Sequence, residues 1–117
     1  MDRIDSNTGL LVQQIYNSKL YSQVILQIQK DFYLCGETLA LEESILPDVL
    51  VQKIYQKIYF LLQHNFNAYL QLLYRIDIAE DKIATRNETI AVIAQKASYY
   101  ILQREYQKIN LRNVNEN

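Results

Sequence analysis

The chain contains one cysteine and one histidine, Cys35 and His64, which are the residue types of a nucleophile and its general base. The sequence supports their pairing weakly, because no further group stands in a pattern that would orient the histidine. Cys35 is better interpreted as a small apolar residue at a helix end, and His64 as a polar residue at another. An enzyme working through these two residues is therefore the least favoured of three functional hypotheses, and we expect no catalytic site.

Several metal and cofactor sites are excluded because the residues that build them are missing. A structural zinc site takes about four Cys or His ligands, and the chain offers two such residues in total. A di-iron helical bundle needs Glu-x-x-His motifs, but Leu61 stands three residues before His64. Calcium and phosphate loops need glycines at fixed positions, and neither Gly9 nor Gly36 begins such a run. The sequence identifies no metal, no cofactor and no small-molecule ligand.

One stretch of the chain is acidic and contains no basic residue. Between Lys30 and Lys53 lie Asp31, Glu37, Glu42, Glu43 and Asp48. Carboxylates in such a patch can hold a divalent cation, but their spacing matches no known calcium loop. A solvated acidic surface is the preferred interpretation of this stretch.

The last predicted helix carries the opposite charge. Its basic face consists of Lys96, Tyr100, Arg104, Lys108 and Arg112, which are spaced four residues apart and share one slowly turning face. A basic face with an aromatic ring is what proteins use to bind single-stranded nucleic acid. The net charge of −1 gives no overall attraction for nucleic acid, so this function is the alternative and an exposed helix face is preferred. In a third interpretation the basic face contacts the acidic stretch, within one chain or across a dimer.

The ten tyrosines are the remaining functional signal. They cannot all be deeply buried, because each hydroxyl needs a hydrogen-bond partner or water. Tyrosine is also enriched in protein interfaces, and the predicted partner-binding residues are Tyr55, Tyr59, Tyr99, Tyr100 and Tyr106. The leading hypothesis is a non-enzymatic interaction or scaffold protein that self-associates, most simply as a homodimer. Ordinary boundary residues in a small bundle are an equally good explanation of the tyrosines.

These residues would be carried by long helices, because the residues that break helices are rare. Both glycines and the one proline lie in the first half of the chain. Apolar residues recur at helical spacing over 8–34, 48–64, 66–76 and 87–110, with a short turn of helix near 78–83 and a weaker pattern at 17–19. Gly36 predicts a helix stop, and residues 36–47 an ordered loop pinned to the core by its apolar side chains. The predicted fold is all-α: an antiparallel bundle of about four main helices plus a short helical turn, with short connections.

Length and composition predict the domain organisation and the location. A chain of 117 residues forms one domain of ordinary size. We expect residues 1–110 to form the helical-bundle domain and residues 111–117 a frayed polar tail. No segment has the pattern of a signal peptide or the roughly 20 apolar residues that span a bilayer. A lone cysteine is compatible with a reducing compartment, and a cytoplasmic location is predicted.

Two segments carry a resemblance to other proteins. Residues 72–83, with the sequence LLYRIDIAEDKI, and residues 101–108, with the sequence ILQREYQK, resemble small uncharacterised all-helical bacterial proteins. The resemblance implies an all-α fold. It carries no function, so no functional residue is transferred from it.

Overall fold

The regular structure of the chain is helical throughout the residues that the computed structural model describes, which are 5–83 and 87–116. The elements are α1 (Ser6–Asn17), α2 (Tyr21–Leu34), α3 (Pro47–His64), α4 (Phe66–Ile76), the 3-10 turn η1 (Glu80–Lys82) and α5 (Ile90–Glu116). The predicted all-α class is confirmed. Among these helices, none combines the length and the apolar character needed to cross a membrane.

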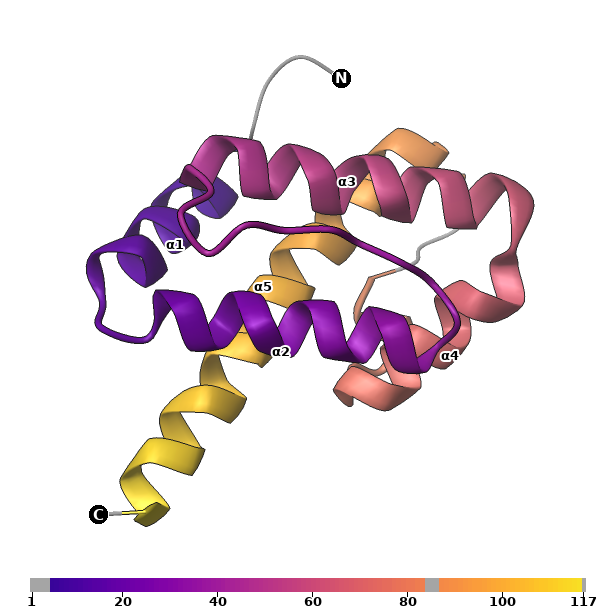
Figure 1. Cartoon of the computed structure of the whole chain (residues 1–117). Coiled ribbons are helices and arrows are strands. Elements are labelled where there is room, and N and C mark those ends of the chain that lie inside the picture. The colour runs from indigo at the N-terminus through magenta and orange to yellow at the C-terminus, as the bar shows by residue number, and fades with distance from the viewer. Residues whose placement is uncertain (1–4, 84–86, 117) are drawn as a thin grey trace.

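The first predicted helix, 8–34, is in fact two helices that meet at an angle (Figure 1). The break falls at the position where the apolar pattern weakens. Ser18 ends α1, because both its hydroxyl and its backbone N–H donate to the Ile15 carbonyl. The N–H of Leu20 then donates to the Ser18 hydroxyl. Serine offers the backbone these alternatives to helical hydrogen bonds, so a tight turn replaces the continuous helix.

The end of α2 and the start of α3 follow from local residue chemistry. Gly36 has a φ of 81°, the left-handed conformation that favours glycine, and ends α2. The N–H groups of Gly36 and Glu37 donate to the carbonyls of Tyr33 and Phe32, which completes a Schellman motif. Pro47 occupies the first turn of α3, where its missing N–H costs nothing.

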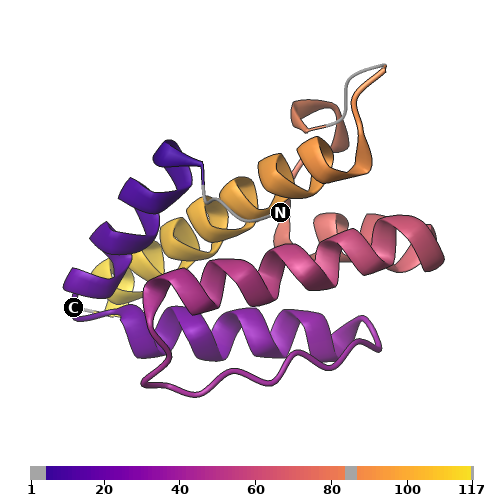
Figure 2. The same ribbon diagram turned by 90° about the horizontal axis from the view of Figure 1, so that it is seen from above.

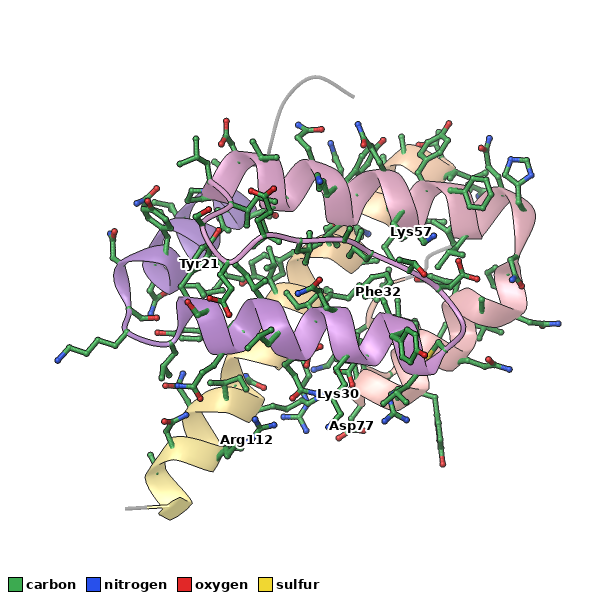
Figure 3. The ribbon with its side chains drawn as sticks, viewed as in Figure 1. Tyr21, Lys30, Phe32, Lys57, Asp77 and Arg112 are labelled. Carbon is green, nitrogen blue, oxygen red and sulfur yellow. The ribbon has the colours of Figure 1, made fainter. Side chains whose placement is uncertain are left out.

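The helices α2 and α3 run in the same direction, which differs from the predicted antiparallel arrangement with short connections (Figures 1 and 2). The connection of residues 35–46 returns along both helices and is well anchored. Leu41 and Ile45 are buried, and the Tyr21 hydroxyl donates to the Ile45 carbonyl. Figure 3 shows Lys57 beside this connection, where its Nζ lies 3.1 Å from Glu37 Oε1. The antiparallel four-helix detail is therefore not confirmed.

The helix α5 is central, because it packs against α1, α2, α3 and α4. Ala94 and Ala97 are fully buried on it, and their small side chains let neighbouring helices approach closely. The helix continues through 111–116, where the composition predicts a frayed polar tail; residue 117 lies outside the described residues. Arg112 donates to Gln27 Oε1 at 2.8 Å, which ties this last part of α5 to α2.

Candidate functional site

A hollow of about 880 Å³ opens between α2, α4 and α5. We call it the groove, and its lining residues are Gln27, Asp31, Leu34, Cys35, Leu70, Gln71, Tyr74, Arg75, Asp77 and Lys108. Three and four residues separate neighbours on one helix face, so the regular α2 and α4 helices present these side chains in rows. In Figure 3, Asp77 and Arg112 lie on the side of α2 that faces away from α3.

The floor of the groove is built around one carboxylate. Asp31 is only 3% exposed. Lys108 Nζ lies 3.0 Å from its Oδ2, and Arg75 Nε lies 3.4 Å from its Oδ1. Burial alone would raise the pKa of Asp31, but hydrogen bonds with Glu105, Lys108 and Gln27 outweigh it and hold the pKa below its ordinary value. Asp31 is therefore ionised at neutral pH and joins α2, α4 and α5.

A second carboxyl lies beneath this floor. Glu105 is 0% exposed. Lys108 Nζ lies 2.9 Å from its Oε1, but neither oxygen of Glu105 accepts a hydrogen bond from the described residues. Burial first, and then the hydrogen bond with Asp31, raises the pKa of Glu105 to about 8. A protonated Glu105 donates to Asp31, so the two carboxyls hold one proton between them at neutral pH.

Two carboxyls whose pKa values are driven apart resemble the acid and base of an active site. The geometry argues against that use, because Glu105 is fully buried and does not line the groove. A substrate in the groove would meet only the ionised Asp31, which already has two cations. The arrangement is better suited to fixing three helices at one point than to proton transfer.

The structure does not place Cys35 and His64 in a shared site. Cys35 lines the groove, and burial raises the pKa of its thiol, with a smaller opposing effect from Arg75. The thiol is therefore protonated at neutral pH and is a poor nucleophile. His64 is exposed at the end of α3 and does not line the groove. Its ring packs against Phe60, with 4.8 Å between the ring centroids.

The predicted partner-binding tyrosines lie mostly against the core. Tyr55 is buried, and its ring centroid lies 5.9 Å from that of Tyr59. Tyr59, Tyr100 and Tyr106 are half-buried and pack against the core. Tyr99 is half-buried and meets the Tyr100 ring edge-on at 5.3 Å. Four of the five residues therefore form two ring pairs, Tyr55 with Tyr59 on α3 and Tyr99 with Tyr100 on α5, and Tyr106 belongs to neither pair.

The most exposed tyrosines are Tyr74, at 89%, and Tyr33, at 72%. Tyr74 lines the groove and was missed by the sequence analysis. A signal for it was present: Leu72, Leu73 and Ile76 define the buried face of α4, and Tyr74 falls outside the arc that they span.

Each cation of the predicted basic face has a polar partner within the chain. Lys96 pairs with Glu88 at 2.7 Å, Arg104 with Asp77 at 3.0 Å, Lys108 with Asp31, and Arg112 with Gln27. The ring of Tyr100 lies beneath Lys82 Nζ, 5.9 Å from its centroid. The contact between Lys108 and Asp31 joins the basic face to the acidic stretch within one chain, as the third interpretation proposed.

The rest of the acidic stretch separates into a paired residue and three exposed ones. Glu37 pairs with Lys57, while Glu42, Glu43 and Asp48 are exposed. Within residues 5–83 and 87–116, no cation forms an ion pair with these three residues. No three His, Cys, Asp or Glu side chains of the same ranges gather as ligands for a metal ion.

Comparison with known proteins finds no matching family model, no matching curated protein and no matching solved structure.

Proposed function

We propose that the protein is a non-enzymatic cytoplasmic interaction protein that self-associates through the groove. The observation that carries the proposal is the exposure of apolar side chains around this hollow. Tyr74 is 89% exposed and Leu34 is 49% exposed, and both line the groove. Apolar side chains gathered at a concave site are a feature of interaction surfaces, and tyrosine beside arginine, here Tyr74 and Arg75, is typical of their energetic centres.

The floor of the groove also favours binding, because it is held in place before a partner arrives. Asp31 contacts Lys108 and Arg75 from two other helices. Side chains that are already fixed lose little freedom when a partner binds, so more of the contact energy contributes to affinity.

The proposal moves the contact surface away from the tyrosines predicted from the sequence. Tyr55 is only 6% exposed, and Tyr59 and Tyr106 lean against the core. These side chains can bury little further area against a second molecule. Nucleic-acid binding through the basic face is not proposed, because the net charge of −1 gives the chain no overall attraction for a phosphate backbone.

Sedimentation from low to high micromolar concentration tests the proposal. Tyr74→Ala is expected to weaken self-association by about tenfold or more, which is the effect of losing an aromatic anchor. Tyr33→Ala is the matched control, since Tyr33 is also highly exposed on its surface but lies outside the groove. A chain that stays monomeric throughout would rule out self-association, and equal losses in both variants would rule out the groove.

A further inference from the structure

We propose that the groove of one copy binds the acidic segment of a second copy. The acidic segment is residues 42–49, which run from the connection after α2 into the first turn of α3. This inference rests on the self-association proposed above and names the part of the second copy that enters the groove.

The groove carries an excess of positive charge. Two cations line the groove, Arg75 and Lys108. Two more contact its lining residues: Arg104 forms an ion pair with Asp77, and Arg112 donates a hydrogen bond to Gln27. These four cations face two ionised carboxylates, Asp31 and Asp77, because the buried Glu105 keeps its proton at neutral pH. The four cations therefore exceed the two ionised carboxylates by two charges, and Arg112 has only the neutral Gln27 as a partner. The net charge of the whole chain, in contrast, is −1.

The acidic segment has the complementary character. Glu42, Glu43 and Asp48 are exposed on it. The stretch of sequence around it, residues 31–52, contains no Lys or Arg. It also presents apolar side chains, since Leu46 is 57% exposed and Val49 is 40% exposed. The segment thus matches both features of the groove, the surplus of cations and the apolar side chains at its rim. Such charge complementarity orients a partner and selects against wrong ones.

A chain cannot fill its own groove with this segment. Figures 1 and 2 show the start of α3 at the end of the molecule where α1 lies, whereas α4, which forms one wall of the groove, lies at the opposite end. The contact must therefore form between copies. A stable interface takes roughly 20–30 residues from each side, which is more than one short segment supplies. A two-fold arrangement repeats the contact and closes the dimer, because each copy supplies both a groove and a segment.

Charge reversal in the segment is the direct test. The double variant Glu42→Lys/Glu43→Lys is expected to weaken dimerisation in sedimentation by about tenfold or more, because four positive charges would replace the attraction in the two contacts. The control Glu80→Lys/Asp81→Lys makes the same charge change at exposed residues of η1, outside the segment, and should not weaken it. Undiminished dimerisation of the first variant would overturn the inference. If Tyr74→Ala still abolished the dimer, the proposed function would stand and only its partner segment would be wrong.

A charge swap tests the pairing itself. A chain carrying Arg75→Glu should dimerise poorly alone but form a mixed dimer with Glu42→Lys/Glu43→Lys, since one contact regains opposite charges. Circular dichroism tests whether the Arg75→Glu variant is folded. If the variant is unfolded, Arg112→Glu takes its place, because Arg112 is exposed and donates a hydrogen bond to the groove residue Gln27. Two folded chains that form no mixed dimer would count against the pairing.

Cys35 supplies an independent readout at the site. It is the only cysteine of the chain and lines the groove. Labelling of its thiol should slow as the wild-type concentration rises, and should stay fast in Glu42→Lys/Glu43→Lys at every concentration. Labelling that slows equally in both proteins would show that another segment covers the groove.

Discussion

Lys108 Nζ lies 3.0 Å from Asp31 Oδ2 and so joins α5 to α2 at a carboxylate that water barely reaches. The same ammonium group lies 2.9 Å from Glu105 Oε1. One cation thus serves two carboxyls whose pKa values move in opposite directions, down for Asp31 and up for Glu105. The stability of this junction depends on which carboxyl keeps the proton.

Replacing Lys108 should destabilise the protein more than replacing any other cation of the basic face. Lys108→Met keeps the aliphatic stem but removes one of the two cations that pair with the buried Asp31 charge, which we expect to cost about 2 kcal/mol of unfolding free energy. Urea unfolding at neutral pH measures it. Lys96→Met is the control, because its ion pair with Glu88 is more exposed and should contribute less than about 1 kcal/mol. Equal losses would mean that the buried junction is no stronger than a surface pair.

Glu105→Gln should stabilise the protein at neutral pH. The pKa of Glu105 is about 8 in the folded chain, against an ordinary value of 4.5. Between these values only the unfolded chain releases the proton, so stability falls as pH rises through this window. Glutamine removes that loss and can still donate to Asp31, so we expect a gain of about 2 kcal/mol at pH 7. Unfolding measured across the acidic to mildly alkaline range should show a flatter pH dependence for the variant.

Asp31→Asn is the matched substitution and should act in the opposite direction. The lowered pKa of Asp31 means that its ionised form stabilises the fold above the ordinary value of 3.8, and that this stabilisation is lost as pH falls through the folded pKa. Asparagine cannot pair with Lys108 and Arg75 as a charge, so the variant should be less stable at pH 7. A stabilised Asp31→Asn together with a destabilised Glu105→Gln would show that the proton sits on Asp31 instead.

The helices and their ends were largely predictable because their signals are local. The Asn65 side chain accepts from the Ala68 N–H, and this cap separates α3 from α4 at the predicted position. Gly36 ends α2 by the left-handed conformation expected of it. In both cases one residue type determines the backbone within a few positions of itself.

The groove was not predictable in the same way, because it depends on contacts between distant residues. Asp31 and Lys108 lie 77 positions apart, and no spacing rule joins them. The basic face was recognised from its four-residue repeat, but a repeat identifies a helix face without saying what packs against it. For the same reason Tyr55 could be assigned to the edge of an apolar stripe, while its burial depends on the helices around α3.

Tyr21→Phe should destabilise the protein by about 1–2 kcal/mol. The Tyr21 hydroxyl donates to the buried carbonyl of Ile45 and so ties α2 to the connection before α3. Phenylalanine keeps the ring but leaves this carbonyl without its donor, which costs the desolvation of an unpaired polar group. Thermal or urea unfolding measures the loss. Faster proteolysis within residues 35–46 should accompany it, and unchanged stability would show that the hydroxyl contributes nothing to the anchoring.

Tyr69→Phe should behave differently, although it deletes the same atom. Tyr69 is 1% exposed, and its hydroxyl has no hydrogen-bond partner among the described residues. Burial raises the pKa of this hydroxyl to about 12, with a smaller effect from Glu80. Removing a buried hydroxyl that has no partner recovers its desolvation cost, so we expect stability to stay the same or to rise by up to about 1 kcal/mol. Urea unfolding beside Tyr21→Phe makes the comparison, since both changes remove one oxygen from a buried ring. A loss of stability as large as that of Tyr21→Phe would mean that the Tyr69 hydroxyl has a hydrogen-bond partner in solution.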